Sequence, residues 1–469
     1  MLPFANRTIP YMQRDVPSWM SDAVFYHIYP LGLVGAPMAN DFEIEPSERM
    51  AVLNDWIPHI KQLGCNALYL GPVFESDFHG YDTANYYMVD RRLGTNQTLK
   101  NFSRNLHHQG IKLVVDTVFN HTGRNFPPFK DLQLKGEESI YKDWFVGVDF
   151  TQQSVYGDNF FYEGWFDAYN LVKLNLRNPE VAVYLFHVVS YWMDEFDIDG
   201  LRLDVAEIMD KDFLAALSAF CRNRKSEFWL MGEVIEGDYR EWANDCMLDS
   251  TTNYEAYKGL YSSHNDKNYF EIAHSLNRQF GYDGVYQDLL LYNFSDNHDT
   301  TRIASILNDA RGVYPLHAIL LTMPGIPSIY YGSEWGIEAI KGAHDDTMLR
   351  PAVDTIPDMS TSALYHFLLQ LIAIRHQQPA LQTGVYRQLH ISHEQFVFSR
   401  ETEDGLIIVA VSQSDQQVDV GVQMDIQAGV EFRDLLAPEH QIFSSHNYLF
   451  INDILPFGTR LLQRVSNYR

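Results

Sequence analysis

The sequence predicts an α/β protein built on a (β/α)8 TIM barrel, with an inserted subdomain after the third strand and an all-β sandwich domain at the C-terminal end. Three observations support this prediction. Amphipathic segments alternate with β-branched apolar runs over most of the 469 residues, as in folds where helices alternate with parallel strands. A long aromatic and polar stretch, residues 122–169, interrupts this alternation, and helical periodicity disappears after about Gln378.

The first complete helix–strand unit spans residues 47–73. Apolar side chains recur at helical spacing from Met50 to Ile60, Gly64 ends the helix, and CNALYLGPV follows as a strand. A second unit ends its helix at Gly110 and continues into IKLVVDTVF. Both units therefore have the order expected around a parallel sheet.

A third helix begins at Asn178-Pro179, which supplies a cap and a proline at the first helical position, and Gly200 then opens the strand LRLDVAEI. The remaining strand candidates are AVFYHIYPL near residue 23, EFWLMGEV, CMLDST, LYNFSD and IPSIYYGSE. This makes eight strands separated by helix-length segments, the order of a (β/α)8 barrel. An open doubly wound sheet is the alternative fold.

The C-terminal part predicts antiparallel strands. QFVFSRETEDGLIIVAVS is typical of a hairpin with Asp404-Gly405 in its turn, and the alternating VDVGVQ and a closing ILPFGTRLL follow. We therefore expect a barrel of residues 1–121 and 170–377, an inserted subdomain of residues 122–169, and a β-sandwich of residues 378–469.

Composition narrows the class of partner. The chain has 35 Lys and Arg against 61 Asp and Glu, a formal charge of −26, so nucleic acid and anionic membranes would be repelled and the substrate is expected to be neutral or cationic. The N-terminus has no apolar core of a signal peptide, and no run approaches the roughly 20 apolar residues of a membrane span. We expect a cytoplasmic protein. The three scattered cysteines are expected to be small buried hydrophobes.

Four predicted strands carry a carboxylate at the end where barrel active sites form. They are Asp116, Asp204, Glu233 and Asp299. Four converging carboxylates repel one another unless a cation or a function holds them. Two kinds of site use such a cluster. One binds a divalent metal ion, and the other cleaves a glycosidic bond with one carboxyl as general acid and another as nucleophile.

The spacing favours the glycosidic chemistry. His79, His121 and His298 lie on separate predicted loops, without the short spacing typical of metal ligands. Arg202 stands two residues before Asp204 on the same strand face, so its charge is expected to keep Asp204 ionised as a nucleophile.

Glu233 has different surroundings. It is flanked by apolar Met231 and Val234 and is expected to face two aspartates, so it is the carboxyl expected to be protonated, which suits a general acid.

These segments resemble the α-amylase superfamily of retaining glycoside hydrolases, and the resemblance covers nearly the whole chain. The four signature segments of that family are similar to DTVFNH at 116–121, GLRLD at 200–204, MGEV around Glu233 and NHD at 297–299, in the family's order on strands three, four, five and seven. Two further motifs are similar to LVKLN at 171–175 and GIPSIYYGSE at 325–334.

The resemblance implies a role for each residue of these segments. Asp204 would be the nucleophile, Glu233 the acid/base, and Asp299 the carboxylate that orients the sugar and stabilises the transition state. The substrate-binding side chains would be Arg202, His121, His298, Tyr81 stacked on the sugar ring, and Asp116 as a structural member of the cluster.

The resemblance makes the usual calcium site doubtful. Calcium-dependent secreted α-amylases usually carry Lys-His shortly after the nucleophile, whereas this chain has Glu207-Ile208 there, although Asn120 is retained. We expect no metal and no cofactor, with calcium as the open alternative.

The motif LVKLN, with Lys173, is similar to that of the cyclomaltodextrinase and neopullulanase group. That group normally adds an N-terminal domain that builds a dimeric active site. The first barrel strand begins near Ala23, so that dimer is not carried over, and the oligomeric state is left unassigned.

The expected function is retaining hydrolysis of α-glucosidic bonds in a neutral oligosaccharide, a short maltodextrin or a cyclodextrin. The alternatives are a transglycosylase using the same three carboxylates and a catalytically inactive sugar-binding member of the superfamily.

Overall fold

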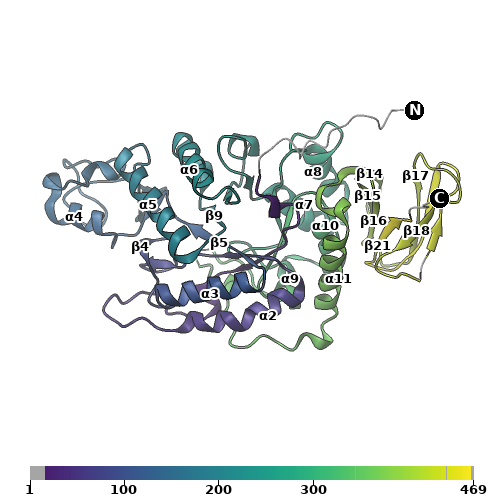
Figure 1. Cartoon of the computed structure of the whole chain (residues 1–469), viewed down its shortest axis with the longest axis horizontal. Helices are drawn as coiled ribbons and strands as arrows, with labels where there is room; N and C mark the ends of the chain where they lie inside the picture. Colours follow the sequence, from purple (N-terminus) through teal and green to yellow (C-terminus); the bar gives the residue numbers. More distant parts are fainter. Residues whose placement is uncertain (1–15, 344, 440, 466–469) are drawn as a thin grey trace.

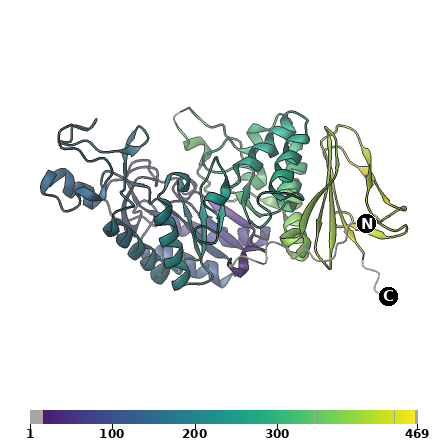
Figure 2. The same cartoon turned by 90° about the horizontal axis from the view of Figure 1, so that it is seen from above.

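The computed structural model describes residues 16–343, 345–439 and 441–465. Residues 1–15, on which the expected absence of a signal peptide largely rests, lie outside this part. The barrel occupies the middle of the molecule, with α4 at one end and the C-terminal strands at the other (Figure 1; Figure 2). No helix in the described ranges has the length and apolar character needed to cross a membrane.

The predicted barrel is confirmed. In the described chain, eight strands form one sheet in the order β11-β10-β9-β5-β2-β1-β13-β12, and each neighbouring pair is parallel. A parallel bridge between Thr252 and Tyr292 joins the two ends, so the sheet closes and the open doubly wound alternative is wrong. The strands are β1 (Phe25–Ile28), β2 (Ala67–Leu70), β5 (Lys112–Thr117), β9 (Gly200–Leu203), β10 (Trp229–Gly232), β11 (Ser250–Thr251), β12 (Tyr292–Phe294) and β13 (Ile326–Tyr330).

The helices follow the apolar periodicity of the sequence. Gly64 adopts a left-handed φ of 99° at the end of α2, and the Asn178 side chain accepts a hydrogen bond from the Glu180 N–H at the start of α5, as the capping pattern predicts. The helices are α1 (Pro30–Leu33), α2 (Leu53–Leu63), α3 (Asn96–His108), α4 (Pro127–Lys135), α5 (Pro179–Phe196), α6 (Lys211–Arg224), α7 (Tyr254–Asn265), α8 (Phe270–Phe280), α9 (Ile303–Ile306), α10 (Val313–Thr322), α11 (Ala363–Gln377) and α12 (Pro379–Thr383).

The interior of the barrel is filled by large side chains. Trp229, Phe25 and Tyr292 are buried there, with ring centroids 5.0 Å apart for Phe25 and Trp229 and 5.4 Å apart for Phe25 and Tyr292. This packing closes the centre of the barrel, so polar side chains gather above it at the carboxyl ends of the strands.

Two small sheets lie beside the barrel. The stretch between β5 and α5 contains α4 and the antiparallel strands β6 (His121–Thr122), β7 (Gly164–Trp165) and β8 (Ala168–Lys173), and the pairing of β8 runs past residue 169. The strands β3 (Phe74–Ser76) and β4 (Thr83–Val89), which the sequence analysis did not predict, form a hairpin after β2. The proposed domain boundaries stay predictions.

The C-terminal strands form the expected all-antiparallel β structure. The main sheet has the order β14-β15-β16-β21-β18-β19, and β17 pairs with β20 in a second sheet. Val397, Ile408, Val420 and Ile451, which come from both sheets, share one apolar cluster, and β14 and β16 contact α8 and α10 of the barrel (Figure 1). The strands are β14 (Val385–Ile391), β15 (Gln395–Glu401), β16 (Leu406–Ser412), β17 (Val418–Gln423), β18 (Glu431–Asp434), β19 (Gln441–Phe443), β20 (Tyr448–Ile454) and β21 (Thr459–Arg464).

Two local predictions have different outcomes. The hairpin turn lies where Asp404-Gly405 predicts it, between β15 and β16, and is closed by the Thr402 N–H donating to the Gly405 carbonyl at 2.9 Å. Cys65 and Cys221 are buried as expected, but Cys246 is exposed, so its expected burial is wrong. It lies in the loop after the 3-10 helix Tyr239–Glu241, where the chain passes over the surface before β11.

Candidate active site

The four predicted carboxylates lie at or just after the carboxyl ends of barrel strands. Asp116 is on β5, Asp204 follows β9 and Glu233 follows β10, while Asp299 lies five residues after β12 ends at Phe294. Asp116, Asp204 and Glu233 are buried, and Asp299 is 29% exposed. These side chains therefore come from one rim of the barrel, three from the neighbouring strands β5, β9 and β10 and one from the loop after β12, which β11 separates from β10.

Arg202 joins three of the carboxylates. One terminal guanidinium nitrogen lies 2.9 Å from Asp116 Oδ1 and 2.9 Å from Asp204 Oδ1, and the other lies 2.9 Å from Glu233 Oε2. The Arg202 side chain is only 3% exposed. The sequence predicted the contact with Asp204 from the strand alternation, but the contacts with the other two strands depend on the register of the closed sheet.

Several groups act on the pKa of Asp204. Burial raises this pKa well above its usual value, Arg202 opposes the shift, and the nearby Glu233 and Asp116 add to it. Because one guanidinium is shared among three carboxylates, Arg202 does not set the charge of Asp204 alone, and the ionised nucleophile stays a prediction.

Glu233 is not in the apolar setting that its neighbours in sequence predict. Its Oε2 accepts a hydrogen bond from the Val205 N–H at 3.0 Å, in addition to the Arg202 contact. Val205 has a φ of 44°, a left-handed conformation that is strained for a β-branched residue. The turn after the Asp204 position therefore presents a backbone donor to the carboxylate of the next strand.

Asp299 has a nitrogen partner on each carboxylate oxygen. His298 Nε2 lies 2.9 Å from Oδ2, and an Arg350 guanidinium nitrogen lies 2.7 Å from Oδ1. Burial alone would raise the pKa of Asp299, but His298, Arg350 and Arg202 lower it well below its usual value. Sequence reasoning missed Arg350, which lies in an irregular segment and carries no periodic or motif signal.

Tyr81 belongs to the same cluster. Its ring stacks on His298 with centroids 5.6 Å apart and planes 8° apart, and its hydroxyl contacts His298 Nε2 and donates to Asp116 Oδ2 at 2.9 Å. The Tyr69 hydroxyl donates to the same Asp116 oxygen at 2.6 Å. Asp116 therefore accepts from two phenols and Arg202, which suits the structural role expected for it.

His121 lies beside Asp204 and is neutral. Its Nε2 is 3.9 Å from Asp204 Oδ2, and its Nδ1 is 3.1 Å from the Asn120 side-chain amide nitrogen. Burial lowers the pKa of His121 to about 3. Because the amide donates to Nδ1, the ring proton is on Nε2, which is buried without a hydrogen-bond partner in the described part of the chain. This N–H therefore has an unused hydrogen-bond capacity.

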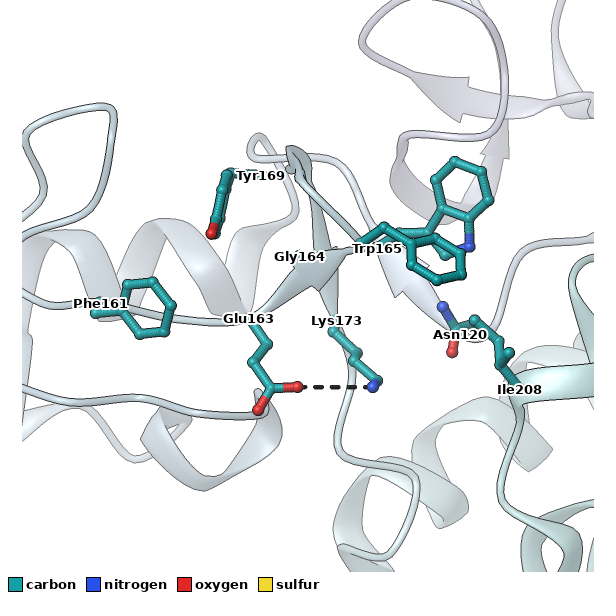
Figure 3. Close-up of a pocket in the computed structure, with 9 residues that line it drawn as sticks. Asn120, Phe161, Glu163, Gly164, Trp165, Tyr169, Lys173 and Ile208 are labelled. Carbon is teal, nitrogen blue, oxygen red and sulfur yellow. Dashed lines mark ion pairs between the residues drawn. The ribbon is translucent and has the colours of Figure 1, made fainter.

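A cavity of about 280 Å³ adjoins this cluster on the side of β7 and β8. The rings of His121 and Trp165 are 6.1 Å apart, which links the cavity to the carboxylates. Figure 3 shows Trp165 on one side of the cavity, Phe161 and Tyr169 on the other, and the Lys173–Glu163 pair, 3.6 Å apart, between them. A neighbouring cavity of about 640 Å³ shares the residues Asn120, Lys173 and Ile208.

Asn120, retained from the usual calcium site, and Glu207, which replaces part of it, both have protein partners. The Asn120 amide contacts His121, and Glu207 Oε2 accepts from the Ile235 N–H at 2.8 Å. Within the described residues, no group of three or more His, Cys, Asp and Glu side chains has an arrangement that could hold a metal ion. The expectation of no calcium stays a prediction.

A (β/α)8 barrel with clustered carboxylates at its rim is compatible with a glycoside hydrolase. The family model described as the catalytic domain of alpha amylase matches residues 50–363. The chain therefore belongs to the α-amylase family of glycoside hydrolases, as its sequence motifs predict.

Known proteins of this family are similar over most of the chain. A cyclomaltodextrinase from Thermoanaerobacter pseudethanolicus is 31% identical over 433 residues, which are 87% of this chain and 74% of that protein. An intracellular maltogenic amylase from Bacillus subtilis is 28% identical over 86% of this chain and 70% of its own length. Cyclic α-maltosyl-(1→6)-maltose hydrolase from Arthrobacter globiformis, in complex with cyclic α-maltosyl-(1→6)-maltose, superposes with a TM-score of 0.80 at 25% identity, covering 96% of this chain and 99% of that one.

Proposed function

We propose that the protein hydrolyses α-glucosidic bonds in short maltodextrins or cyclodextrins with retention of configuration at the anomeric carbon. The observation that carries this proposal is the contact of Arg202 with Asp116, Asp204 and Glu233 at 2.9 Å each. It brings two carboxylates from adjacent strand ends, Asp204 and Glu233, to one guanidinium, which is the close pairing that double displacement needs.

Each carboxylate has a role in this reaction. Glu233 donates its proton to the glycosidic oxygen while Asp204 attacks the anomeric carbon, so the bond to the leaving sugar breaks as the glycosyl ester forms. Glu233 then removes a proton from water, whose oxygen attacks the same carbon and releases Asp204. Asp299, whose pKa is lowered well below its usual value despite burial, stays ionised and stabilises the positive charge that develops on the sugar.

The neutral side chains of the cluster bind the sugar. The free Nε2–H of His121 lies beside Asp204 and donates to a hydroxyl of the sugar being cleaved. The adjoining cavity of about 280 Å³ is lined by Trp165 and Tyr169, whose rings offer apolar faces to further sugar units.

The short insertion after β5 and the names of the relatives support short substrates. The stretch between β5 and α5, which lines the adjoining cavity, can wall few sugar subsites, so binding energy is expected to saturate at short chain length. The similar proteins include a cyclomaltodextrinase and an intracellular maltogenic amylase, which supports small imported oligosaccharides as the substrate and the cytoplasm as the location.

The test of the reaction uses two variants with the same fold. Asp204→Asn is expected to lose turnover on maltotriose and on α-maltosyl fluoride, because the amide does not form the glycosyl ester. Glu233→Gln is expected to lose maltotriose turnover but to release fluoride in the first turnover, since fluoride leaves without a proton. Wild-type rates in Asp204→Asn would contradict the mechanism, and equal failure of Glu233→Gln on both substrates would contradict the acid assignment.

The test of the substrate is a series of initial rates. Catalytic efficiency on maltotriose to maltohexaose, or on cyclodextrins, is expected to exceed that on soluble starch per mole of cleavable ends, with glucose and maltose as products. Products longer than the substrate at high oligosaccharide concentration would identify the transglycosylase alternative, and binding without any turnover would identify the inactive one. Mid-chain cleavage of long amylose with the highest efficiency would contradict the preference for short substrates.

A further inference from the structure

Glu207 connects the loop after the nucleophile strand to the loop after the acid strand. It lies in the short 3-10 helix Ala206–Ile208, three residues after Asp204. Its Oε2 accepts hydrogen bonds from the backbone N–H groups of Ile235 at 2.8 Å and Glu236 at 3.4 Å, just beyond Glu233. Glu207 is half-buried, whereas Ile235 and Glu236 are exposed. Its hydrogen bonds therefore hold the loop after Glu233 at the point where that loop leaves the core.

The same short turn carries the backbone donor to Glu233. Val205 holds its left-handed φ of 44° while its N–H donates to Glu233 Oε2 at 3.0 Å. A β-branched residue keeps such a conformation only where its surroundings hold it there. Within the turn, the Ile208 N–H donates to the Val205 carbonyl at 3.1 Å, and the Glu207 side chain ties the turn to the loop that follows Glu233.

The backbones of the two catalytic carboxylates are held by other bonds. The Asp204 N–H donates to the Thr117 carbonyl at 3.0 Å, and the Glu233 N–H donates to the Leu203 carbonyl at 2.9 Å. The Asp204 side chain is held separately by Arg202. Loss of the Glu207 contacts therefore leaves the nucleophile in place and releases the turn that carries the Val205 N–H.

We propose that Glu207 is a positioning residue for the acid, acting through the Val205 N–H that holds the Glu233 carboxyl group. This inference rests on the proposed function, because it assumes that Glu233 transfers the proton to the leaving sugar. The contacts use one carboxylate oxygen, so the requirement is for an acceptor at this place rather than for a negative charge.

The experiment separates proton donation from nucleophilic attack. On α-maltosyl fluoride, the Asp204 carboxylate bonds to the anomeric carbon as the carbon–fluorine bond breaks, and fluoride leaves with the electron pair and without a proton. Glu207→Ala is expected to lower kcat on maltotriose about tenfold to a hundredfold, in line with the cost of leaving one buried polar group without its partner, and to change KM less than threefold. Its first-turnover fluoride release is expected to stay within about threefold of wild type.

Two further variants provide the controls. Glu207→Gln keeps an acceptor oxygen at the same distance along the side chain and is expected to restore kcat on maltotriose to within about threefold of wild type. Glu236→Ala removes a neighbouring exposed carboxylate, keeps the backbone N–H that Glu207 binds, and is expected to match wild type on both substrates.

The outcomes are distinguishable from a failure of the proposed function. Equal losses of Glu207→Ala on maltotriose and the fluoride would overturn the positioning role, as would wild-type kcat in Glu207→Ala or a Glu207→Gln variant as slow as Glu207→Ala. If the wild-type protein turns over neither substrate, the proposed function fails and the inference fails with it. Support requires the selective loss in Glu207→Ala together with rescue by Glu207→Gln.

Discussion

Replacing Arg202 by Met tests whether one guanidinium holds the active site together. Arg202 is 3% exposed and lies 2.9 Å from each of Asp116, Asp204 and Glu233, so its removal leaves three buried carboxylates without their shared cation. Breaking one buried ion pair costs about 3–5 kcal/mol, because it leaves a buried charge uncompensated. We expect Arg202→Met to lower the free energy of unfolding by at least about 3 kcal/mol at pH 8.

The pH dependence of this loss gives the sharper test. Burial already raises the pKa of Asp204 well above its usual value, and removal of Arg202 removes the influence that opposes this shift. A carboxyl whose folded-state pKa is raised stabilises the protein fully below its unfolded pKa of about 3.9, and this stability is lost as pH rises through the folded pKa. The destabilisation of Arg202→Met is therefore expected to be larger at pH 8 than at pH 5.

The assay is denaturant unfolding of the variant and wild type across pH 5–8. Lys100→Met is the matched control, because Lys100 pairs with Glu195 at 3.1 Å on the surface, where both side chains are about one third exposed. It is expected to cost less than about 1 kcal/mol at any of these pH values. An Arg202→Met loss no larger than that of the control, or one equal at pH 5 and pH 8, would refute the reasoning.

Three further predictions concern the same cluster. Asp204→Asn is expected to raise the melting temperature at pH 7–8, since it removes a carboxyl whose raised pKa makes its ionised form costly in the folded state; a lower melting temperature would contradict this. Arg350→Met is expected to lower kcat/KM on maltotriose about tenfold, because it removes a 2.7 Å contact with Asp299. Asp346→Asn is the control: it alters a weaker 3.7 Å contact with Arg350 and is expected to change kcat/KM less than about threefold. A chelator is expected to shift neither activity nor melting temperature, because Glu207-Ile208 stands where the calcium-dependent relatives carry Lys-His; a loss of several degrees would reveal a bound ion.

Hydrophobic periodicity was sufficient to predict the barrel. All eight predicted strand runs contribute strands to the closed sheet. Most are apolar runs buried on both faces, whereas β11 consists of the buried polar residues Ser250 and Thr251. The strands β3 and β4 were missed. β3 has three residues, and its pairing with β4 is interrupted by register shifts. So short and irregular a pair gives no regular alternation of apolar and polar residues in the sequence.

Strand ends and resemblance to family motifs placed most of the clustered side chains, and Arg350, which carries neither signal, was missed. Asp116, Arg202 and the carboxylates after β9 and β10 could be placed because a strand end defines their position. Arg350 follows the short 3-10 helix Thr347–Leu349, outside any barrel strand, and reaches Asp299 only through the folded path of that segment. Nothing local in the sequence predicts such a contact.

The charge states show most directly why local reasoning was insufficient. Arg202 and Asp204 form the i, i+2 pair that strand alternation predicts, and considered alone this pair makes Asp204 a firmly ionised carboxylate. The structure adds Asp116 and Glu233 to the same guanidinium, and the pKa of Asp204 rises. Asp299 instead receives His298 and Arg350, and its pKa falls. Neighbours from other strands and loops thus shift the pKa values of Asp204 and Asp299 in opposite directions. Asp299, with the lowered pKa, stays ionised and is suited to stabilise a cationic transition state.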